Sequence, residues 1–301
     1  MKKLTIFAMT EKGYAVVSSI FSACPDEIEA VVAARDKNIA NDYFEEIEDF
    51  CGKNKIPFHK KSDSWPTRTE YAIAVSWRWI IHDGPSHLIV FHDSLLPRYR
   101  GFNPLVTALI HGDTKIGVTA LYATAEYDRG DIISQSVSTI SYPIRIEDAI
   151  KTILVNYQEL AIRIAESLVR EEAPVGIPQR ETDVSYSLWR DEEDYFIDWT
   201  QSATTLRRTI DASGSPYKGS ASTIEGKVVR ILKAEALDEV SIANRVCGKI
   251  IFIHDSKPVV VCGEGLLRID ELVDESGHSL LPFHRFRIRF RGRADQDKPP
   301  L

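Results

Sequence analysis

The stretch that decides the fold is LIVFHDSLLPRYRG, residues 88–101, in which four apolar residues lead directly into a polar loop. A short, continuous apolar run is typical of a strand that is buried on both faces of a parallel sheet. His92 therefore comes at the carboxyl end of that strand. Open α/β sheets bind their ligands at this edge, so the segment predicts both a sheet and the place of its chemistry.

The rest of the first half alternates apolar runs with amphipathic ones. The apolar runs are Leu4–Met9, Glu29–Ala34, Tyr71–Ser76 and Leu88–Phe91, and a polar helical stretch lies near Asp42–Lys53. Further on, Lys115–Tyr122 and Asp131–Ile140 predict two extended strands, and Ile146–Arg170 has the length and periodicity of a helix. This alternation predicts an α/β, Rossmann-like domain with a mostly parallel sheet covered on both faces.

The second half is rich in predicted strands. Two prolines and a glycine in Ala173–Pro178 end the preceding helix and indicate a domain boundary nearby. After a helix at about Ser202–Ala212, predicted strands follow at 220–231, 247–254, 259–262, 266–272 and 283–290. A small β-barrel is the expected architecture. We therefore predict a catalytic domain over 1–184, a linker over 185–204 and a barrel domain over 205–301.

Composition and charge narrow the class of protein. A chain of 301 residues can bury two cores, and its formal net charge of −7 disfavours a nucleic acid partner. The four cysteines lack metal-ligand spacing, so neither a metal site nor a disulfide framework is expected. The apolar run at Leu4–Met9 is too short for a signal peptide or a membrane span. These features predict a cytoplasmic protein without a membrane partner; a homodimer stays open.

A second polar loop follows the strand predicted at Lys115–Tyr122. It reads EYDRGD over residues 126–131 and contains Asp128. Taken alone, His92 reads as a structural residue at a strand end, and Asp128 reads as the cap of an ordinary polar turn. Only the two stretches together carry a more specific meaning.

Together the two stretches resemble the formyltransferase family, whose members carry Asn-x-His-x-Ser-Leu-Leu-Pro-x-Tyr-Arg-Gly and, further on, Asp-x-Gly. The resemblance continues in the second half at Ile197–Trp199, Pro216–Gly219 and Cys262–Ile269. It implies a Rossmann-like formyltransferase catalytic domain followed by a small C-terminal OB-like β-barrel. It also implies transfer of a formyl group from 10-formyltetrahydrofolate, the formyl donor, to an amine.

The resemblance assigns roles to the two loop residues. As the amine attacks the formyl carbon, an oxyanion forms and a proton must reach the departing folate nitrogen. His92 is expected to stabilise the oxyanion and to act as an acid, and Asp128 to orient it and relay protons. No metal is required for this chemistry.

One family residue is missing. The asparagine two residues before the histidine is Val90 here, and valine cannot donate a hydrogen bond to an oxyanion. Loss of one such donor costs about 10²–10³ in rate. Three explanations stay open: a substitute donor, for which Asn103 is the candidate; a backbone or water donor; or a catalytically weak relative.

Two further groups of residues are candidates for binding. Arg78, Trp79 and Ile80 resemble the family segment that holds the pterin, with Tyr127 and Asp128 expected opposite them; a buried aromatic core is the alternative for Trp77 and Trp79. For the acceptor, the candidates are Met9, Thr10 and Lys12 after the first strand, and Ser94, Arg100 and Gly101 in the catalytic loop. A plain turn is the alternative reading of Met9–Gly13.

Three functions compete. We favour a sugar N-formyltransferase that modifies an amino-deoxy sugar, a small-molecule substrate expected to be nucleotide-linked, for a surface polysaccharide; the acidic charge and the segment Trp189–Trp199 support it. Methionyl-tRNA formyltransferase is the second candidate. A catalytically silent folate- or nucleotide-binding module is the third, and Val90 is its best argument. Basic and aromatic residues alternate over Phe283–Arg291, which fits RNA binding but equally fits a half-buried barrel strand.

Overall fold

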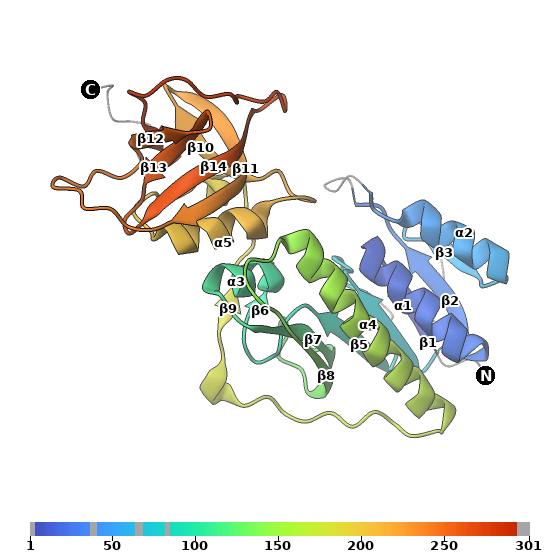
Figure 1. Ribbon diagram of the computed structural model, residues 1–301. Helices are drawn as coiled ribbons and strands as arrows, with labels where there is room; N and C mark the ends of the chain where they lie inside the picture. The colour runs from blue at the N-terminus through green and yellow to red at the C-terminus, as the bar shows by residue number, and fades with distance from the viewer. Residues whose placement is uncertain (1–3, 37–40, 64–68, 82–84, 294–301) are drawn as a thin grey trace. The chain divides into compact units, whose positions relative to one another are not determined.

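The computed structural model describes residues 4–36, 41–63, 69–81 and 85–293, and the chain divides into two compact units (Figure 1). The N-terminal unit comprises Met1–Leu105, Lys115–Ile140 and Ile150–Leu188. The C-terminal unit comprises Val106–Thr114, Ser141–Ala149 and Trp189–Leu301. Each unit has a sheet of its own.

The N-terminal unit is built on a seven-stranded sheet in the order β3-β2-β1-β4-β5-β7-β8. Its strands are β1 Leu4–Ala8, β2 Ile28–Ala33, β3 Phe58–Lys60, β4 Tyr71–Val75, β5 His87–His92, β7 Lys115–Tyr122 and β8 Ile132–Thr139. The first five are parallel to one another, and β7 and β8 join antiparallel. Every residue of β1 and β4 is buried, as their apolar runs require. The predicted α/β, Rossmann-like class is confirmed.

The first four helices along the chain are α1 Thr10–Ala23, α2 Phe44–Asn54, α3 Pro104–His111 and α4 Ile146–Val169; most of α3 and the start of α4 belong to the C-terminal unit. Short 3₁₀ turns cover Pro25–Glu27 and Glu181–Asp183. The stretch Met9–Gly13 is the first turn of α1, so its interpretation as a plain turn is wrong. Met9 is the N-cap, and a Cβ at Gly13 would lie 3.0 Å from the backbone of Ala8. Glycine therefore lets α1 pack closely against the strand that it follows.

The C-terminal unit contains a six-stranded antiparallel sheet in the order β12-β13-β14-β11-β10-β15. The strands are β10 Ser220–Ile224, β11 Lys227–Leu237, β12 Ile250–His254, β13 Lys257–Val261, β14 Leu266–Asp274 and β15 Phe290–Arg291. An antiparallel bridge between Lys249 and Arg289 joins the starts of the two edge strands. The sheet therefore curls into the expected barrel.

Helix α5, Ala203–Ser213, packs against this sheet and is capped by Ser202, whose side chain accepts a hydrogen bond from the N–H of Thr205. The core of the unit also takes in Ile197 and Trp199, and Trp199 Nε1 donates to Ser222 Oγ at 3.1 Å. The last part of the stretch expected to be a linker thus packs in the barrel core. The domain boundaries at 184 and 204 stay predictions.

The carboxyl-terminal strand is shorter than its sequence pattern predicts. Phe290 and Ile288 are buried, but Phe286 is 53% exposed and lies outside β15. The expected alternation over Phe283–Arg291 therefore holds only near its end. Two short strands, β6 Arg100–Gly101 and β9 Tyr186–Ser187, pair in parallel beside the N-terminal sheet, and a 3₁₀ turn covers Glu193–Tyr195.

Within the described ranges, no helix is both long and apolar enough to cross a membrane.

Replacing Trp199 by alanine should lower the free energy of unfolding by about 3–5 kcal/mol, because a buried indole is lost from the barrel core. Trp189→Ala is the matched control, since Trp189 is 63% exposed, and it should change the free energy by less than about 0.5 kcal/mol. Urea titration of both variants makes the measurement. Equal effects would contradict the packing of this segment in the core.

Candidate active site

His92 is the last residue of β5 and is buried. Its Nε2 lies 2.8 Å from the carbonyl oxygen of Tyr99, and its Nδ1 lies 3.4 Å from Oδ1 of Asp128. A carbonyl oxygen only accepts hydrogen bonds, so Nε2 must carry a proton. Nδ1 is the ring nitrogen that faces the carboxylate.

Asp128 lies in the loop between β7 and β8, and its two oxygens serve different partners. Oδ2 accepts a hydrogen bond from the N–H of Gly101 at 2.8 Å, and Oδ1 faces His92. The carboxylate is thereby fixed in place beside the imidazole. The structure brings together the two residues that the sequence predicted as catalytic, in an arrangement that suits proton transfer.

Gly101 cannot be replaced without moving this site. Its φ is +104°, and a Cβ there would lie 2.5 Å from the carbonyl oxygen of Ser187 in the paired strand β9. Its N–H is already used by Asp128. Gly101 was predicted to bind the acceptor, but in the structure its N–H holds the carboxylate of Asp128.

Arg100 differs more sharply from its prediction. It is 0% exposed, and its guanidinium donates to Oε1 of Gln179 and, at 3.2 Å, to Oε1 of Glu181. A side chain that is enclosed and bonded in this way does not reach a ligand. Arg100 therefore braces the loop, contrary to the expectation that it contacts the acceptor.

Two other predicted acceptor residues are also buried. Met9 is 1% exposed, and Ser94 is enclosed with its hydroxyl donating to the carbonyl oxygen of Arg98 at 2.7 Å. The structure therefore argues against both as ligand contacts. Thr10 is only half-buried, and its hydroxyl donates to Ser76 Oγ at 3.3 Å, so its role in binding stays a prediction.

Lys12 belongs to a polar cluster beside His92. Its ammonium and the hydroxyl of Tyr157 both donate to the carboxylate of Asp93. Burial alone would raise the pKa of Asp93, but Lys12, Tyr157 and His92 outweigh it and lower that pKa. The pKa of Tyr157 is raised, mainly by burial and next by the neighbouring charge of Asp93. Lys12 thus neutralises a half-buried carboxylate. Sequence reasoning missed Tyr157 because it lies far along the chain on α4.

The residues expected to hold a pterin lie largely at the surface. Trp79 is part-exposed and has Lys61 Nζ 4.2 Å from its ring centre, while Ile80 is 77% exposed and Tyr127 is 76% exposed. Arg78 donates to the buried carboxylate of Asp36 at 3.1 Å. These apolar side chains are open to a ligand, and their role in binding stays a prediction.

The two residues linked to the missing asparagine lie in different settings. Val90 packs in a cluster with Phe7, Ala74 and Trp77 on one face of the sheet, so Trp77 belongs to the core. Asn103 lies at φ +49° immediately before α3. Its role as a substitute donor stays a prediction.

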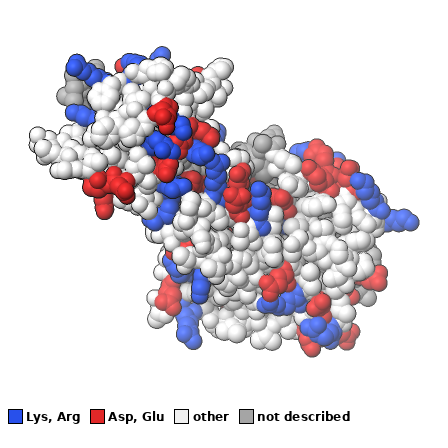
Figure 2. Space-filling model, in the orientation of Figure 1, with Lys and Arg blue, Asp and Glu red and all other residues white. Residues whose placement is uncertain are grey.

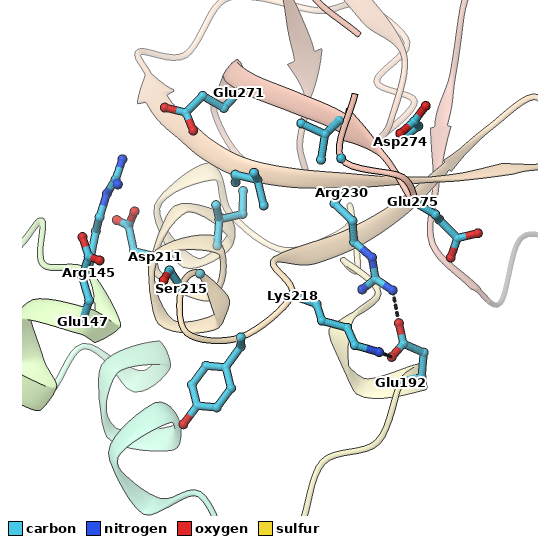
Figure 3. A pocket seen from close by; sticks show the side chains of 16 residues that line it. Arg145, Glu147, Glu192, Asp211, Ser215, Lys218, Arg230, Glu271, Asp274 and Glu275 are labelled. Carbon is cyan, nitrogen blue, oxygen red and sulfur yellow. Dashed lines mark hydrogen bonds and ion pairs between the residues drawn. The ribbon is translucent and has the colours of Figure 1, made fainter. Parts of the chain in front are cut away.

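A cavity of about 780 Å³ lies in the C-terminal unit (Figure 3). On one side Glu192 is paired with both Arg230 and Lys218, and on another Asp211 lies near Arg145. Burial raises the pKa of Asp211. None of the candidate site residues predicted from the sequence lines this cavity, and His92 and Asp128 are not among its lining residues.

Two family profiles match the chain. The one described as formyl transferase matches residues 8–161, and the one described as formyl transferase, C-terminal domain, matches residues 190–282. The first profile therefore matches the Rossmann-like half and the second matches the barrel half.

Curated relatives similar to this chain carry the name methionyl-tRNA formyltransferase. The protein of Nitrosococcus oceani is 31% identical over 62% of this chain and 57% of its own length. That of Dechloromonas aromatica is 31% identical over 66% and 61%, and that of Syntrophomonas wolfei is 28% identical over 83% and 79%. The chain thus spans about three fifths of the length of the first two relatives.

Solved structures share the fold. WlaRD, a sugar 3N-formyl transferase crystallised with dTDP and 5-N-formyl-THF, aligns with a TM-score of 0.68 at 17% identity, over 93% of this chain and 98% of its own. An N-formyltransferase from Helicobacter canadensis, in complex with folinic acid and dTDP-3-aminofucose, gives 0.67 at 15% identity over 91% and 99%. HypX from Aquifex aeolicus gives 0.59 at 18% identity over 92% and 45%.

Replacing Lys12 by methionine should lower the free energy of unfolding at pH 7 by about 3–5 kcal/mol, because it leaves Asp93 charged and unpaired by a cation. The lowered folded-state pKa of Asp93 stabilises the native protein above the unfolded value of about 4, and that stability is lost as the pH falls. The deficit of the variant should therefore shrink towards low pH. Urea titration at several pH values tests this.

The double variant Lys12→Met, Asp93→Asn supplies the control. It removes the uncompensated charge and should recover part of the stability lost in Lys12→Met. A double variant less stable than Lys12→Met would contradict the assigned ion pair.

Proposed function

The chain belongs to the formyl transferase family, and we propose that it transfers a formyl group from 10-formyltetrahydrofolate to the amino group of an amino-deoxy sugar that is linked to a nucleotide. The observation that carries the proposal is the placement of His92 beside Asp128 at the carboxyl edge of the sheet. The Gly101 N–H fixes the carboxylate of that pair. A pair of this kind manages the proton that an amine loses when it is acylated.

The hydrogen bonds of His92 set the order of its proton transfers. Because Nε2 donates to the Tyr99 carbonyl oxygen, Nδ1 is the nitrogen left for chemistry. In the neutral ring Nδ1 has a lone pair, so it first takes the proton that the attacking amine releases. The carboxylate of Asp128, 3.4 Å from Nδ1, stabilises the resulting charge. The protonated Nδ1 then gives its proton to the leaving nitrogen, and the ring returns to its initial state.

The exposed side chains predicted to hold the pterin suit a flat heterocycle. Trp79, Ile80 and Tyr127 present apolar surface that the described part of the chain leaves largely uncovered. Aromatic and aliphatic side chains of this kind pack against planar rings. The donor would supply an electrophilic formyl carbon, and these residues would hold its pterin ring.

The choice of a sugar acceptor has two supports. The fold neighbours that cover most of both chains include a sugar 3N-formyl transferase and an N-formyltransferase in complex with dTDP-3-aminofucose. The amino group of such a sugar would react at His92, and its product would serve a surface polysaccharide. A cytoplasmic location and a homodimer stay predictions.

The second support is the pairing of basic residues in the C-terminal unit. The ion pairs are Lys218 and Arg230 with Glu192, Arg245 with Glu239, Lys257 and Arg268 with Asp270, Arg285 with Glu225, and Arg293 with Glu193. On the face drawn in Figure 2, blue and red side chains are interspersed. Cations already paired with carboxylates offer a polyanion little net attraction, which favours a small acceptor over tRNA.

The sequence relatives favour a different acceptor. The curated proteins similar to this chain are methionyl-tRNA formyltransferases, so methionyl-tRNA is the second candidate acceptor. The third candidate, a silent binding module, rests on Val90 in place of the family asparagine.

His92→Ala and Asp128→Asn should each lower kcat by about 10²–10⁴-fold, because each removes one partner of the proton-transfer pair. The assay follows tetrahydrofolate release from 10-formyltetrahydrofolate with nucleotide-linked amino sugars as acceptors. His87→Ala is the matched control, because His87 is an exposed histidine at the other end of the same strand, and its kcat should be unchanged.

The acceptor panel separates the three functions. Turnover only with methionyl-tRNA would replace the sugar by the second candidate. Folate binding without turnover on either acceptor class would favour the silent module. Equal turnover by His92→Ala and the native protein would contradict the assigned catalytic pair.

A further inference from the structure

Gln179 spans the loop that carries Asp128. Its Nε2 donates to the carbonyl oxygen of Asp128 at 2.7 Å and to that of Gly130 at 2.8 Å. A primary amide nitrogen carries two N–H groups, so one side chain makes both bonds at once. Gln179 therefore ties together the two ends of the short segment that presents the catalytic carboxylate.

The conformation of Asp128 makes such a tie necessary. Its φ is +55°, in the left-handed region that a residue with a Cβ rarely adopts. A backbone in this region persists only when its surroundings hold it there. The Gly101 N–H holds the side chain of Asp128, and Gln179 holds its backbone.

Arg100 determines which way the Gln179 amide faces. Its Nε and Nη2 donate to Gln179 Oε1 at 3.0 and 2.8 Å, and Arg100 is 0% exposed. Rotating the amide by half a turn would set N–H groups against the guanidinium and an oxygen against two carbonyl oxygens. Only the observed orientation satisfies every partner. Arg100 thus keeps the amide nitrogen of Gln179 turned towards the Asp128 loop.

From these contacts we infer that Gln179, oriented by Arg100, is a positioning residue for Asp128. It acts through Asp128, by keeping the Asp128 carboxylate at its observed distance from His92 Nδ1. Its effect on rate rests on the proposed formyl transfer, whereas its effect on the geometry of the pair does not.

Two substitutions separate positioning from a purely structural role. Gln179→Leu removes the contacts to both the loop and Arg100. Gln179→Glu keeps an acceptor for Arg100 but turns a carboxylate oxygen towards the carbonyl oxygens of Asp128 and Gly130. Glu181→Gln is the control, because Glu181 also accepts a hydrogen bond from Arg100, whereas the bonds to the carbonyl oxygens of Asp128 and Gly130 come from Gln179.

We expect both Gln179 variants to lower kcat by about 10–10²-fold with KM little changed, because misplacement of a catalytic group slows the chemical step. The thermal midpoint should fall by less than about 4 °C. Glu181→Gln should keep the kcat of the native protein. Native kcat in Gln179→Glu would overturn the inference, since it would show that Gln179 serves only to pair with Arg100.

A second readout needs no turnover. The ¹⁵N chemical shifts of the His92 ring report the hydrogen bonds at both nitrogens, and they should move in Gln179→Leu and not in Glu181→Gln. If the native protein transfers no formyl group, the proposed function fails, and these shifts still test the positioning. Unchanged shifts in Gln179→Leu would overturn it.

Discussion

The backbone of Tyr99–Gly101 positions both His92 and Asp128, because it forms a hydrogen bond with each of them. The Tyr99 carbonyl oxygen accepts from His92, and the Gly101 N–H donates to Asp128, each at 2.8 Å. The two side chains come from β5 and from the β7–β8 loop, so this short segment is what relates them. Its path in turn requires a glycine at +104° beside Ser187. A change there would displace both partners together.

Two carboxylates at this edge of the sheet, Asp93 and Asp128, lie in different electrostatic environments. Asp93 follows His92 in the chain, but Lys12 and Tyr157 each donate to one of its oxygens and keep it charged where it is half-buried. Asp128 instead faces the imidazole of His92. Burial with a dedicated cation makes Asp93 structural, whereas a backbone N–H holds Asp128 without neutralising it.

Hydrophobic periodicity and motif spacing in the sequence predicted most strands of the sheet and the two residues of the candidate site. Strands β1, β2, β4 and β5 follow from continuous apolar runs, whereas no such run predicted β3, and the pairing of His92 with Asp128 follows from the family pattern. The sequence did not predict which partners the polar side chains of the loop contact. An arginine in this motif can face solvent or, as Arg100 does, donate to Gln179, and the sequence does not distinguish the two. Helix α1 was missed because its polar first turn, with Gly13, has the composition of a turn. Gln179 lies in no motif, and only the fold brings it to Asp128.

Val90 has a consequence for how the oxyanion is stabilised in the proposed reaction. The valine extends the apolar cluster around Phe7 and Trp77, so this position contributes packing and no hydrogen-bond donor. A neutral His92 would offer no free N–H either, because the N–H at Nε2 is already hydrogen-bonded to the Tyr99 carbonyl oxygen. A donor appears at Nδ1 only after the ring has accepted the proton of the amine. The charge on the oxyanion and the N–H at Nδ1 that would stabilise it would then arise in the same step. The alignment of Asp128 with His92 is therefore more important here than in a site with a permanent amide donor.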